Sequence, residues 1–245
     1  HALNIPRLID ELCYNLVTPC HGIFHPDSWM YNPDIQLLDF SLAKAASLLD
    51  EAGWVIDPSR EGWRHKVIDG HPVKFEFTLT YASASEVMRE VSAIYQEDLK
   101  RVGVSMKPQP MEWATLSQRV RKHEFQASSA AWGTGIDPDT SWNLWHSDQY
   151  DPEGKFGRNY PGFKNDRVDE LFRLGREEND QKKRQKYYQE ITKIIYDEQP
   201  YTFMWNRGTL WGINNRIRGI EASPGRGLFG FDPAVKVWWV PARKD

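Results

Sequence analysis

Apolar positions in this chain recur at two different periods, and the period predicts which segments are helices and which are strands. Between Ser41 and Ala52 apolar residues recur at helical spacing, and Gly53 follows as a residue that accepts a left-handed conformation. This predicts an amphipathic helix. In Lys74–Tyr81 aromatic and aliphatic residues occupy every second position, which predicts a strand with one buried face.

The next segments repeat this alternation. Ser83–Glu86 has the spacing of a capping box and opens a predicted helix that ends at Gly103. Val104–Met111 is predicted as a strand whose two prolines favour a sheet edge or an early fraying of the strand. Trp113–Lys122 then reads as a short helix, and Phe125–Ala131 as a third, buried strand. The result is a βαβαβ unit with right-handed crossovers, so all three parallel strands should end at one edge of the sheet.

Residues 137–163 are rich in Gly, Pro, Asp and aromatic residues and predict a long loop with one helical turn near Thr140–His146. Loops of this length are usually functional or mobile. Helices are predicted over Asp166–Glu178 and Asp180–Glu198. The side chains expected to face inward from the second are Tyr187, Ile191, Ile194, Ile195 and Glu198.

Short extended segments complete the predicted fold. Tyr201–Asn206 is expected to pair with Thr209–Ile213 as a hairpin, and Val235–Val240 reads as a last strand or as a segment that contacts another lobe.

The candidate binding chemistry is concentrated in Ala130–Asp139, where a tryptophan and a glycine-rich bend follow the third predicted strand. Open α/β sheets hold small molecules beyond the carboxyl ends of their strands. Glycine lets the backbone approach a ligand, and an indole offers a flat apolar wall with one donor. We therefore expect a solute cleft at this edge. The candidate ligand-binding residues are Trp132, Gly133, Thr134, Gly135, Glu112, Trp113, Tyr81, Ser83, Trp142, Asn159 and Tyr160.

Most of these candidates also have a purely structural interpretation. The bend at Gly133–Gly135 can simply pack under the long loop, and Glu112 can be an acid at a helix N-terminus, where the dipole favours it. Asn159 and Tyr160 can anchor the loop. Arg158 can meet an anionic ligand or remain solvated.

Composition narrows the function classes. The chain carries 31 Lys+Arg against 34 Asp+Glu, a net charge of −3, and has no long basic run, which disfavours nucleic-acid binding. No apolar stretch approaches the roughly 20 residues of a membrane helix. Cys13 and Cys20 can pair if the protein is exported. The sequence has no second Cys/His pair at zinc-finger spacing, so we expect neither a metal nor another cofactor.

An enzyme is not the expected class. The sequence lacks nucleophile-elbow, zinc-protease, Walker and dinucleotide motifs. A carbohydrate-active hydrolase remains an alternative and would need two carboxylates in one pocket, for which Glu112 and Asp137 are the pair to nominate. An aromatic-rich interaction module is the second alternative.

Several segments in order resemble the C-terminal lobe of extracellular solute-binding proteins of family 5, the oligopeptide- and dipeptide-binding type that serves ABC importers. Each segment is a weak mark alone, but the ordered set covers nearly the whole chain. The segments are Leu3–Asp10 (for ALxxAIDR), Ala43–Trp54 (AKxLLxEAGW), Glu97–Val104 (xDLxxIGI), Trp113 (xxWxxL), Asp137–Pro138 (DP), Asn159–Asp169 (NxxGYxNPEVDxL) and Gln185–Pro200 (xxYxxxQxIIxxExP).

The resemblance implies an α/β fold, namely a lobe of the type II periplasmic-binding-protein fold with a mixed sheet, a βαβαβ core and flanking helices. Residues 1–245 would be the C-terminal lobe, with an entry segment near the hinge (1–40), the α/β core (41–213) and a segment returning toward the absent N-terminal lobe (214–245). It further implies a periplasmic or extracellular protein, lipid-anchored in some members, whose partners are a small-molecule or peptide ligand and ABC permease subunits.

One departure from the family pattern concerns the ligand. Peptide-binding members place an aspartate shortly after the cleft tryptophan, where it pairs with the α-amine of the peptide. Here Thr134 or Gly135 occupies that position, and Asp137 aligns with the acid that is expected to cap the following helical turn. A buried amine without a counter-charge is costly. A sugar, an oligosaccharide or an opine therefore stays open beside a peptide.

Overall fold

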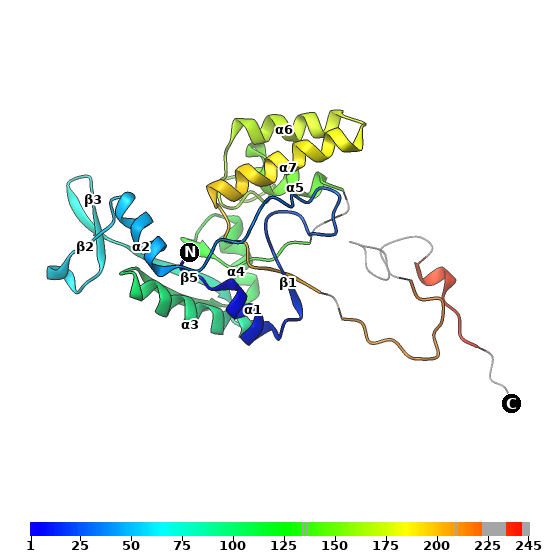
Figure 1. The fold of residues 1–245 in the computed structure, drawn as a ribbon, viewed down its shortest axis with the longest axis horizontal. Coiled ribbons are helices and arrows are strands. Elements are labelled where there is room, and N and C mark those ends of the chain that lie inside the picture. The colour runs from blue at the N-terminus through cyan, green and yellow to red at the C-terminus, as the bar shows by residue number, and fades with distance from the viewer. Residues whose placement is uncertain (134, 136, 209, 222–233, 242–245) are drawn as a thin grey trace. The chain divides into compact units, whose positions relative to one another are not determined.

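The computed structural model describes residues 1–133, 135, 137–208, 210–221 and 234–241, and the chain divides into two compact units. We call them the first unit (His1–Asn15, Leu37–Trp132 and Asp151–Phe156) and the second unit (Leu16–Gln36, Gly133–Tyr150 and Gly157–Asp245). Figure 1 shows the ribbon of both. The α/β core expected over 41–213 is thus divided between the units.

A three-stranded parallel sheet forms the centre of the first unit. β5 (Glu76–Ala82) lies in the middle, between β6 (Ser105–Met111) and β7 (Ala127–Ser128). This confirms the βαβαβ unit and the edge position of the proline-containing strand. β7 is shorter than predicted, since the side chain of Gln126 accepts the hydrogen bond of the Thr78 N–H at 2.8 Å, where a longer ladder would continue.

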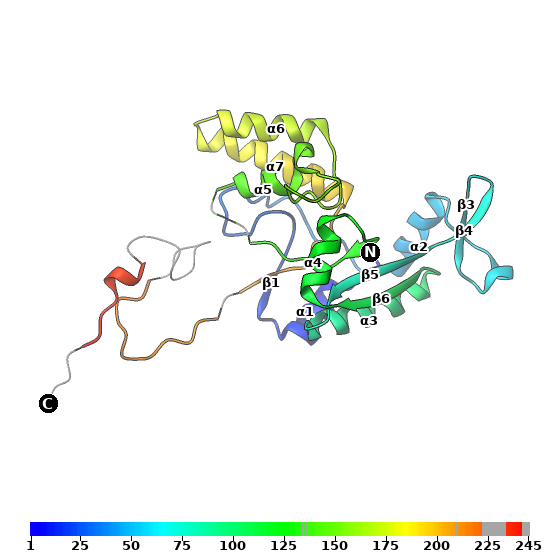
Figure 2. The same cartoon turned by 180° about the vertical axis from the view of Figure 1, so that it is seen from behind.

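Two helices connect these strands. α3 (Glu86–Arg101) packs on β5 and β6, and α4 (Trp113–Arg121) lies on the opposite face of the sheet (Figure 2). The cap of α3 is Ser85, which accepts from the Met88 N–H, and not Ser83 as the capping-box pattern predicted. The N–H of Ser83 is still bonded to the sheet, so the helix cannot begin there.

The core of the first unit lies between the parallel sheet and helices α2 (Leu42–Glu51) and α3. Alternation along β5 turns Phe77 and Leu79 toward Leu99 and Val102, as the period predicted. Gly103 follows α3 with φ +78°, the left-handed conformation that glycine adopts without strain. The helix α1 (Ile5–Cys13) also contacts α3.

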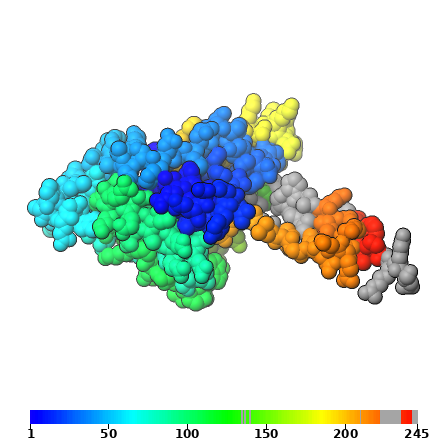
Figure 3. Space-filling model, turned by 60° about the horizontal axis from the view of Figure 1, so that its bottom comes forward, coloured from blue at the N-terminus to red at the C-terminus, as the bar shows by residue number. Residues whose placement is uncertain are grey.

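A separate antiparallel sheet extends from the same unit and appears in cyan in Figure 3. It consists of β2 (Val55–Ile56), β3 (Arg64–Ile68) and β4 (His71–Lys74), with the 3-10 turn η1 (Pro58–Arg60) between the first two. Parallel and antiparallel pairs therefore lie in separate sheets. Arg64 holds this sheet in place: its buried guanidinium donates to the carbonyls of Val102 at 2.7 Å and Trp54 at 2.5 Å.

The regular structure of the second unit is mainly helical. It contains α5 (Asp139–Trp145), the turn η2 (Ser147–Gln149), α6 (Asp166–Glu177) and α7 (Gln181–Glu198). The periodicity of both long helices is confirmed, with two differences on α7. Tyr188 is the fully buried tyrosine while Tyr187 is half-buried, and Glu198 is exposed and accepts from the Asn165 amide at 2.6 Å.

An irregular segment of the second unit is fastened to α7 through side-chain amides. Gln185 donates to the Trp29 carbonyl at 2.6 Å and Gln189 to the Tyr31 carbonyl at 2.9 Å, while Asn32 donates to the Gln189 carbonyl at 3.0 Å. The bonds from Gln185 and Gln189 satisfy carbonyls of the irregular segment, which have no partner in a helix or sheet.

The pairing of the last strands differs from the prediction. β8 (Trp205–Arg207) pairs antiparallel with β1 (Val17–Pro19), which supplies the backbone partners expected from Thr209–Ile213. Thr209 itself lies outside the described residues. The predicted strand Val235–Val240 is instead the turn η3 (Ala234–Val237) followed by one bridge between Trp239 and Arg218.

In the part of the chain that the structure describes, no helix combines the length and the apolar composition needed to cross a bilayer.

Candidate functional site

The carboxyl ends of β5, β6 and β7 meet at one edge of the parallel sheet, as predicted. We use the name strand edge for this edge together with the residues that directly follow the three strands. Ser83 follows β5 and is exposed, with its N–H bonded to the Met111 carbonyl at 2.7 Å. After β7, the Ser129 N–H donates to the Thr80 carbonyl at 2.9 Å. The backbone at the strand edge is therefore fixed by the sheet, while the Ser83 side chain points to solvent.

Glu112 follows β6 and serves as the N-cap of α4. One carboxylate oxygen accepts from the N–H groups of Ala114 at 2.7 Å and Thr115 at 3.2 Å. These bonds satisfy donors that the first helical turn leaves without a partner. The structural interpretation of Glu112 is thus favoured over a role as a ligand or as an acid-base group.

Trp113 and Tyr81 are both brought to the strand edge, but with opposite exposure. Trp113 is the first residue of α4 and remains 67% exposed. Tyr81 is 4% exposed because the alternation along β5 places it on the same side as Leu79, within the core. Trp113 is available to a ligand, whereas the burial of Tyr81 indicates packing.

The bend after β7 lies where the two units join along the chain. Trp132 is half-buried and ends the segment Leu37–Trp132 of the first unit. Gly133 begins the segment Gly133–Tyr150 of the second unit. A Cβ added at Gly133 would meet no described atom within 4 Å, so packing does not explain this glycine. At Gly135 the Thr140 methyl would lie 3.4 Å away, an ordinary contact. Thr134 lies outside the described residues.

Trp142, a weaker candidate, is covered on both faces of its indole. The His146 ring stacks on it at 3.7 Å between centroids and 13° between planes, and the Arg176 guanidinium lies 3.8 Å from its centroid. Phe172 meets it edge-on at 5.8 Å. The ring therefore packs within the second unit and offers no open face as a ligand platform.

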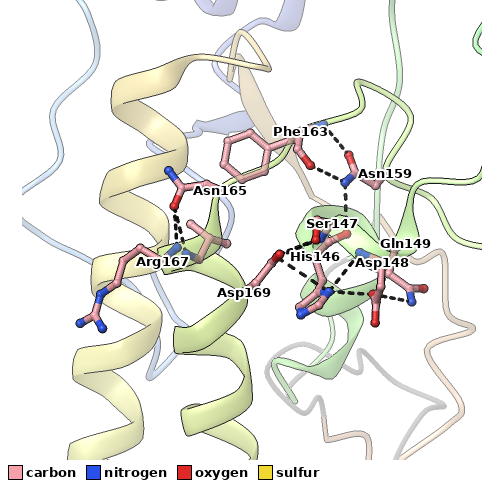
Figure 4. A network of polar contacts seen from close by, with 10 residues as sticks. His146, Ser147, Asp148, Gln149, Asn159, Phe163, Asn165, Arg167 and Asp169 are labelled. Atoms are coloured by element: carbon pink, nitrogen blue, oxygen red, sulfur yellow. Dashed lines mark hydrogen bonds and ion pairs between the residues drawn. The ribbon is translucent and has the colours of Figure 1, made fainter.

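Asn159 is fully buried and anchors the long loop (Figure 4). Its amide nitrogen donates to the carbonyls of His146 at 3.1 Å and Phe163 at 2.8 Å, and its oxygen accepts from the Phe163 N–H at 2.9 Å. These bonds use both hydrogens of the amide and one acceptor position of its oxygen, and the residue is fully buried, so the anchoring interpretation is favoured over ligand contact. Tyr160, the next residue, is half-buried in the same loop.

Asp169 fixes the loop from the side of α6; the residue ends the family-like segment Asn159–Asp169, but the pattern did not indicate this role. Its carboxylate accepts from the Ser147 N–H at 2.9 Å and from the Ser147 hydroxyl, and lies 3.7 Å from His146 Nδ1 (Figure 4). Asp148 is closer to the same nitrogen, at 2.7 Å. The partners of Asp169 lie 22 positions away in sequence, which explains why local patterns missed them.

The predicted capping role of Asp137 is wrong. Pro138 is the N-cap of α5 and already has helical backbone angles (φ −68°, ψ −11°), and among the described residues no side-chain hydrogen bond caps this helix. Asp137 stands one residue too early and is exposed.

Residues Asp151–Phe156 return to the first unit as a turn organised by one carboxylate. Asp151 accepts from the N–H groups of Glu153 at 3.0 Å, Lys155 at 2.6 Å and Phe156 at 3.1 Å. Burial acts to raise the pKa of Asp151, but these hydrogen bonds outweigh it and the net effect lowers the pKa below the ordinary aspartate value.

Cys13 and Cys20 are both thiols, and burial raises the pKa of the Cys20 thiol. Among the described residues, no group of three or more His, Cys, Asp or Glu side chains is placed to hold a metal ion.

This chain is similar in sequence and structure to known solute-binding proteins. The family model described as bacterial extracellular solute-binding proteins, family 5 Middle, matches residues 1–153. The oligopeptide-binding protein AppA of Bacillus subtilis is 30% identical over 88% of this chain and 38% of its own length. Its structure in complex with a nonapeptide superimposes with a TM-score of 0.80 at 28% identity, over 98% of this chain and 46% of that one.

More distant matches include a second oligopeptide-binding protein and a protein named for heme binding. The oligopeptide-binding protein of Thermus thermophilus, solved with a pentapeptide, has a TM-score of 0.76 at 24% identity and covers 84% of this chain and 36% of that chain. Heme-binding protein A of Haemophilus influenzae is 22% identical over 95% of this chain and 39% of its own length. The chain thus spans less than half the length of these relatives.

Proposed function

The chain belongs to the bacterial extracellular solute-binding proteins of family 5, and from this premise we propose that it is the C-terminal lobe of the substrate-binding component of an ABC importer. The complete protein would enclose a small solute between two lobes and deliver it to membrane permease subunits. The strand edge carries this proposal, because three parallel strands end together beside the exposed Trp113 and the bend at Trp132 and Gly133. Such edges are where open α/β sheets hold ligands.

The location and partners follow from the family. Its members are extracellular or periplasmic solute-binding transport proteins rather than enzymes. We propose the same location for this protein, with a lipid anchor as one form of attachment. Residues 214–245 would return to the N-terminal lobe. Described residues of that segment support this with exposed apolar side chains, among them Trp239 and Val240, both 56% exposed.

For the solute we propose a peptide as the first class to test. The support is the oligopeptide-binding relative at 30% identity. The carboxylate of Glu112 is engaged in capping α4, and an amine-pairing aspartate is missing at the Thr134–Gly135 position of the sequence. This half of the cleft would therefore recognise a peptide through indoles, hydroxyls and backbone groups. The same groups suit a sugar or an opine, which remain the alternatives.

The test is calorimetric titration of peptides, oligosaccharides and opines into the complete protein and into residues 1–245 alone. We expect the complete protein to bind one class at about micromolar Kd, near −8 kcal/mol. The isolated chain should bind at least a hundredfold more weakly, because half of the contacts and the closure of the lobes are missing. Equal affinity of the isolated chain would contradict a shared cleft.

A further inference from the structure

An open groove of about 380 Å³ runs along α4 within the first unit. We call it the α4 groove. Of the candidate ligand-binding residues, its lining contains Trp113. One wall is the outer face of α4 and the other is the turn at Glu153 and Gly154. Its lining residues are Trp113, Ala114, Ser117, Gln118, Arg121, Lys122, Glu153 and Gly154.

The second wall of the groove is firmly built. Gly154 has φ +68°, and a Cβ there would lie 2.4 Å from the Arg121 carbonyl oxygen, so the turn approaches the end of α4 as closely as a glycine permits. His123 Nε2 lies 2.8 Å from the Asp151 carbonyl oxygen and ties the turn to the residue that follows the helix. The hydrogen bonds to the Asp151 carboxylate hold the turn itself. The groove is therefore a fixed feature of this unit.

The two ends of the groove differ in chemistry. At the strand edge, Trp113 presents an exposed indole. At the far end, Arg121 and Lys122 are exposed, and within the described part of the chain their side chains have no hydrogen bond or ion pair. The one acid in the lining, Glu153, is paired with Lys155. The far end thus carries two cations that form no ion pair with a described carboxylate.

From these observations we infer that the α4 groove binds a carboxylate of the solute at Arg121 and Lys122 while an apolar part of the same solute lies on Trp113. This rests on the proposed function and narrows it to anionic ligands. From Trp113 to Arg121 the helix rises about 12 Å, a span that roughly three or four extended peptide residues would cover. Both a C-terminal carboxylate and an acidic side chain supply the required chemistry.

The helix dipole gives Arg121 a second, purely structural effect. A cation in the last turn of α4 stabilises the helix whether or not it binds a ligand. A loss of stability on substitution would therefore say nothing about binding. The test has to compare ligands that differ only in charge, because such a ratio is insensitive to the stability of the variant.

The probes are four versions of one alanine- and phenylalanine-containing hexapeptide, titrated calorimetrically into the complete protein. They are the free acid, the C-terminal amide, and two amides that carry either a glutamate or a glutamine in the chain. The double variant Arg121→Gln with Lys122→Gln removes the proposed site. The control, Lys44→Gln with Lys100→Gln, removes the same charge from exposed positions of α2 and α3 in the same unit.

In the wild-type protein and in the control we expect the acid to bind about three to ten times more tightly than its neutral counterpart, the effect of one or two exposed charge pairs. The free-acid and amide pair reports a terminal carboxylate, and the glutamate and glutamine pair reports a side chain. In the Arg121→Gln, Lys122→Gln variant the ratio should fall to about one.

A ratio that persists in the double variant overturns the inference and leaves the proposed function intact. The same holds for peptides that bind the wild type without regard to charge. If none of the four peptides binds the wild type, the proposal of a peptide solute falls together with the inference. Unchanged peptide ratios with reduced uptake by the importer would assign Arg121 and Lys122 to permease docking, which also overturns it.

Discussion

The strand edge of the first unit and the long loop of the second unit both supplied candidate ligand residues, but their side chains are engaged differently. At the strand edge, Trp113 and Ser83 are exposed, and the backbone around them is fixed by the parallel sheet. In the second unit, Asn159 of the loop and Trp142 of α5 are covered by contacts within their own unit. A sheet positions its edge residues without using their side chains, whereas an irregular loop needs its polar side chains to hold its backbone.

The largest expected effect concerns the loop. Asn159→Ala should lower the free energy of unfolding by about 2–4 kcal/mol, because it leaves buried backbone groups of His146 and Phe163 without partners. Urea unfolding followed by far-UV circular dichroism measures this. The matched control is Asn179→Ala at an exposed position, where we expect a change within about 0.5 kcal/mol. Equal effects of the two substitutions would remove the anchoring role.

Two tryptophans, one at the bend and one in the second unit, should respond differently to substitution by alanine. Trp132→Ala in the complete protein should weaken solute binding at least about tenfold, or about 1.4 kcal/mol, because an apolar wall of the cleft is removed. Trp142→Ala should instead lower stability with less effect on the dissociation constant, since Trp142 packs against His146 and Arg176. Calorimetric titration and thermal unfolding of both variants separate these outcomes. An unchanged dissociation constant for Trp132→Ala would exclude it from the site.

A smaller effect is expected at Glu112. Glu112→Ala removes the N-cap of α4 and should cost about 1 kcal/mol of stability, measured by urea unfolding. Glu112→Asn keeps a capping side chain without the charge and should recover most of the loss. If both variants were as stable as the wild type and bound solute more weakly, Glu112 would be a ligand residue instead.

The smallest effect is a pH dependence that arises at the Asp151 turn. Because the pKa of Asp151 is lowered in the folded protein, its contribution to stability is present above the unfolded value near about 4 and is lost as pH falls through the folded value. Thermal unfolding of the wild type and of Asp151→Asn between neutral and acidic pH should show a stability difference that shrinks on acidification. A difference that grows on acidification would contradict the assignment.

Much of the fold could be predicted because its signals are local. The alternation in Lys74–Tyr81, the helical spacing of α3 and the glycine that ends it each lie within a few residues, and together they fix the parallel sheet. Trp113 was found because it comes two residues after the end of a predicted strand. The same reasoning selected Glu112, whose position at a helix start is equally typical of a cap.

What the sequence did not reveal depends on distant partners. β8 pairs with β1, whose residues come near the start of the chain, and a hairpin pattern beside β8 favoured the wrong neighbour. The bonds of Asp169 to Ser147 and of Gln185 to Trp29 likewise join distant segments. Such pairings are decided by tertiary packing and leave no periodicity in the sequence.

Hydrogen exchange of the complete protein with and without its solute tests most directly whether the strand edge, and not the long loop, contacts the ligand. We predict slower amide exchange on solute addition at residues 111–115 and 129–133, with residues 157–163 unchanged. Protection confined to 157–163, with no change at the strand edge, would contradict the account.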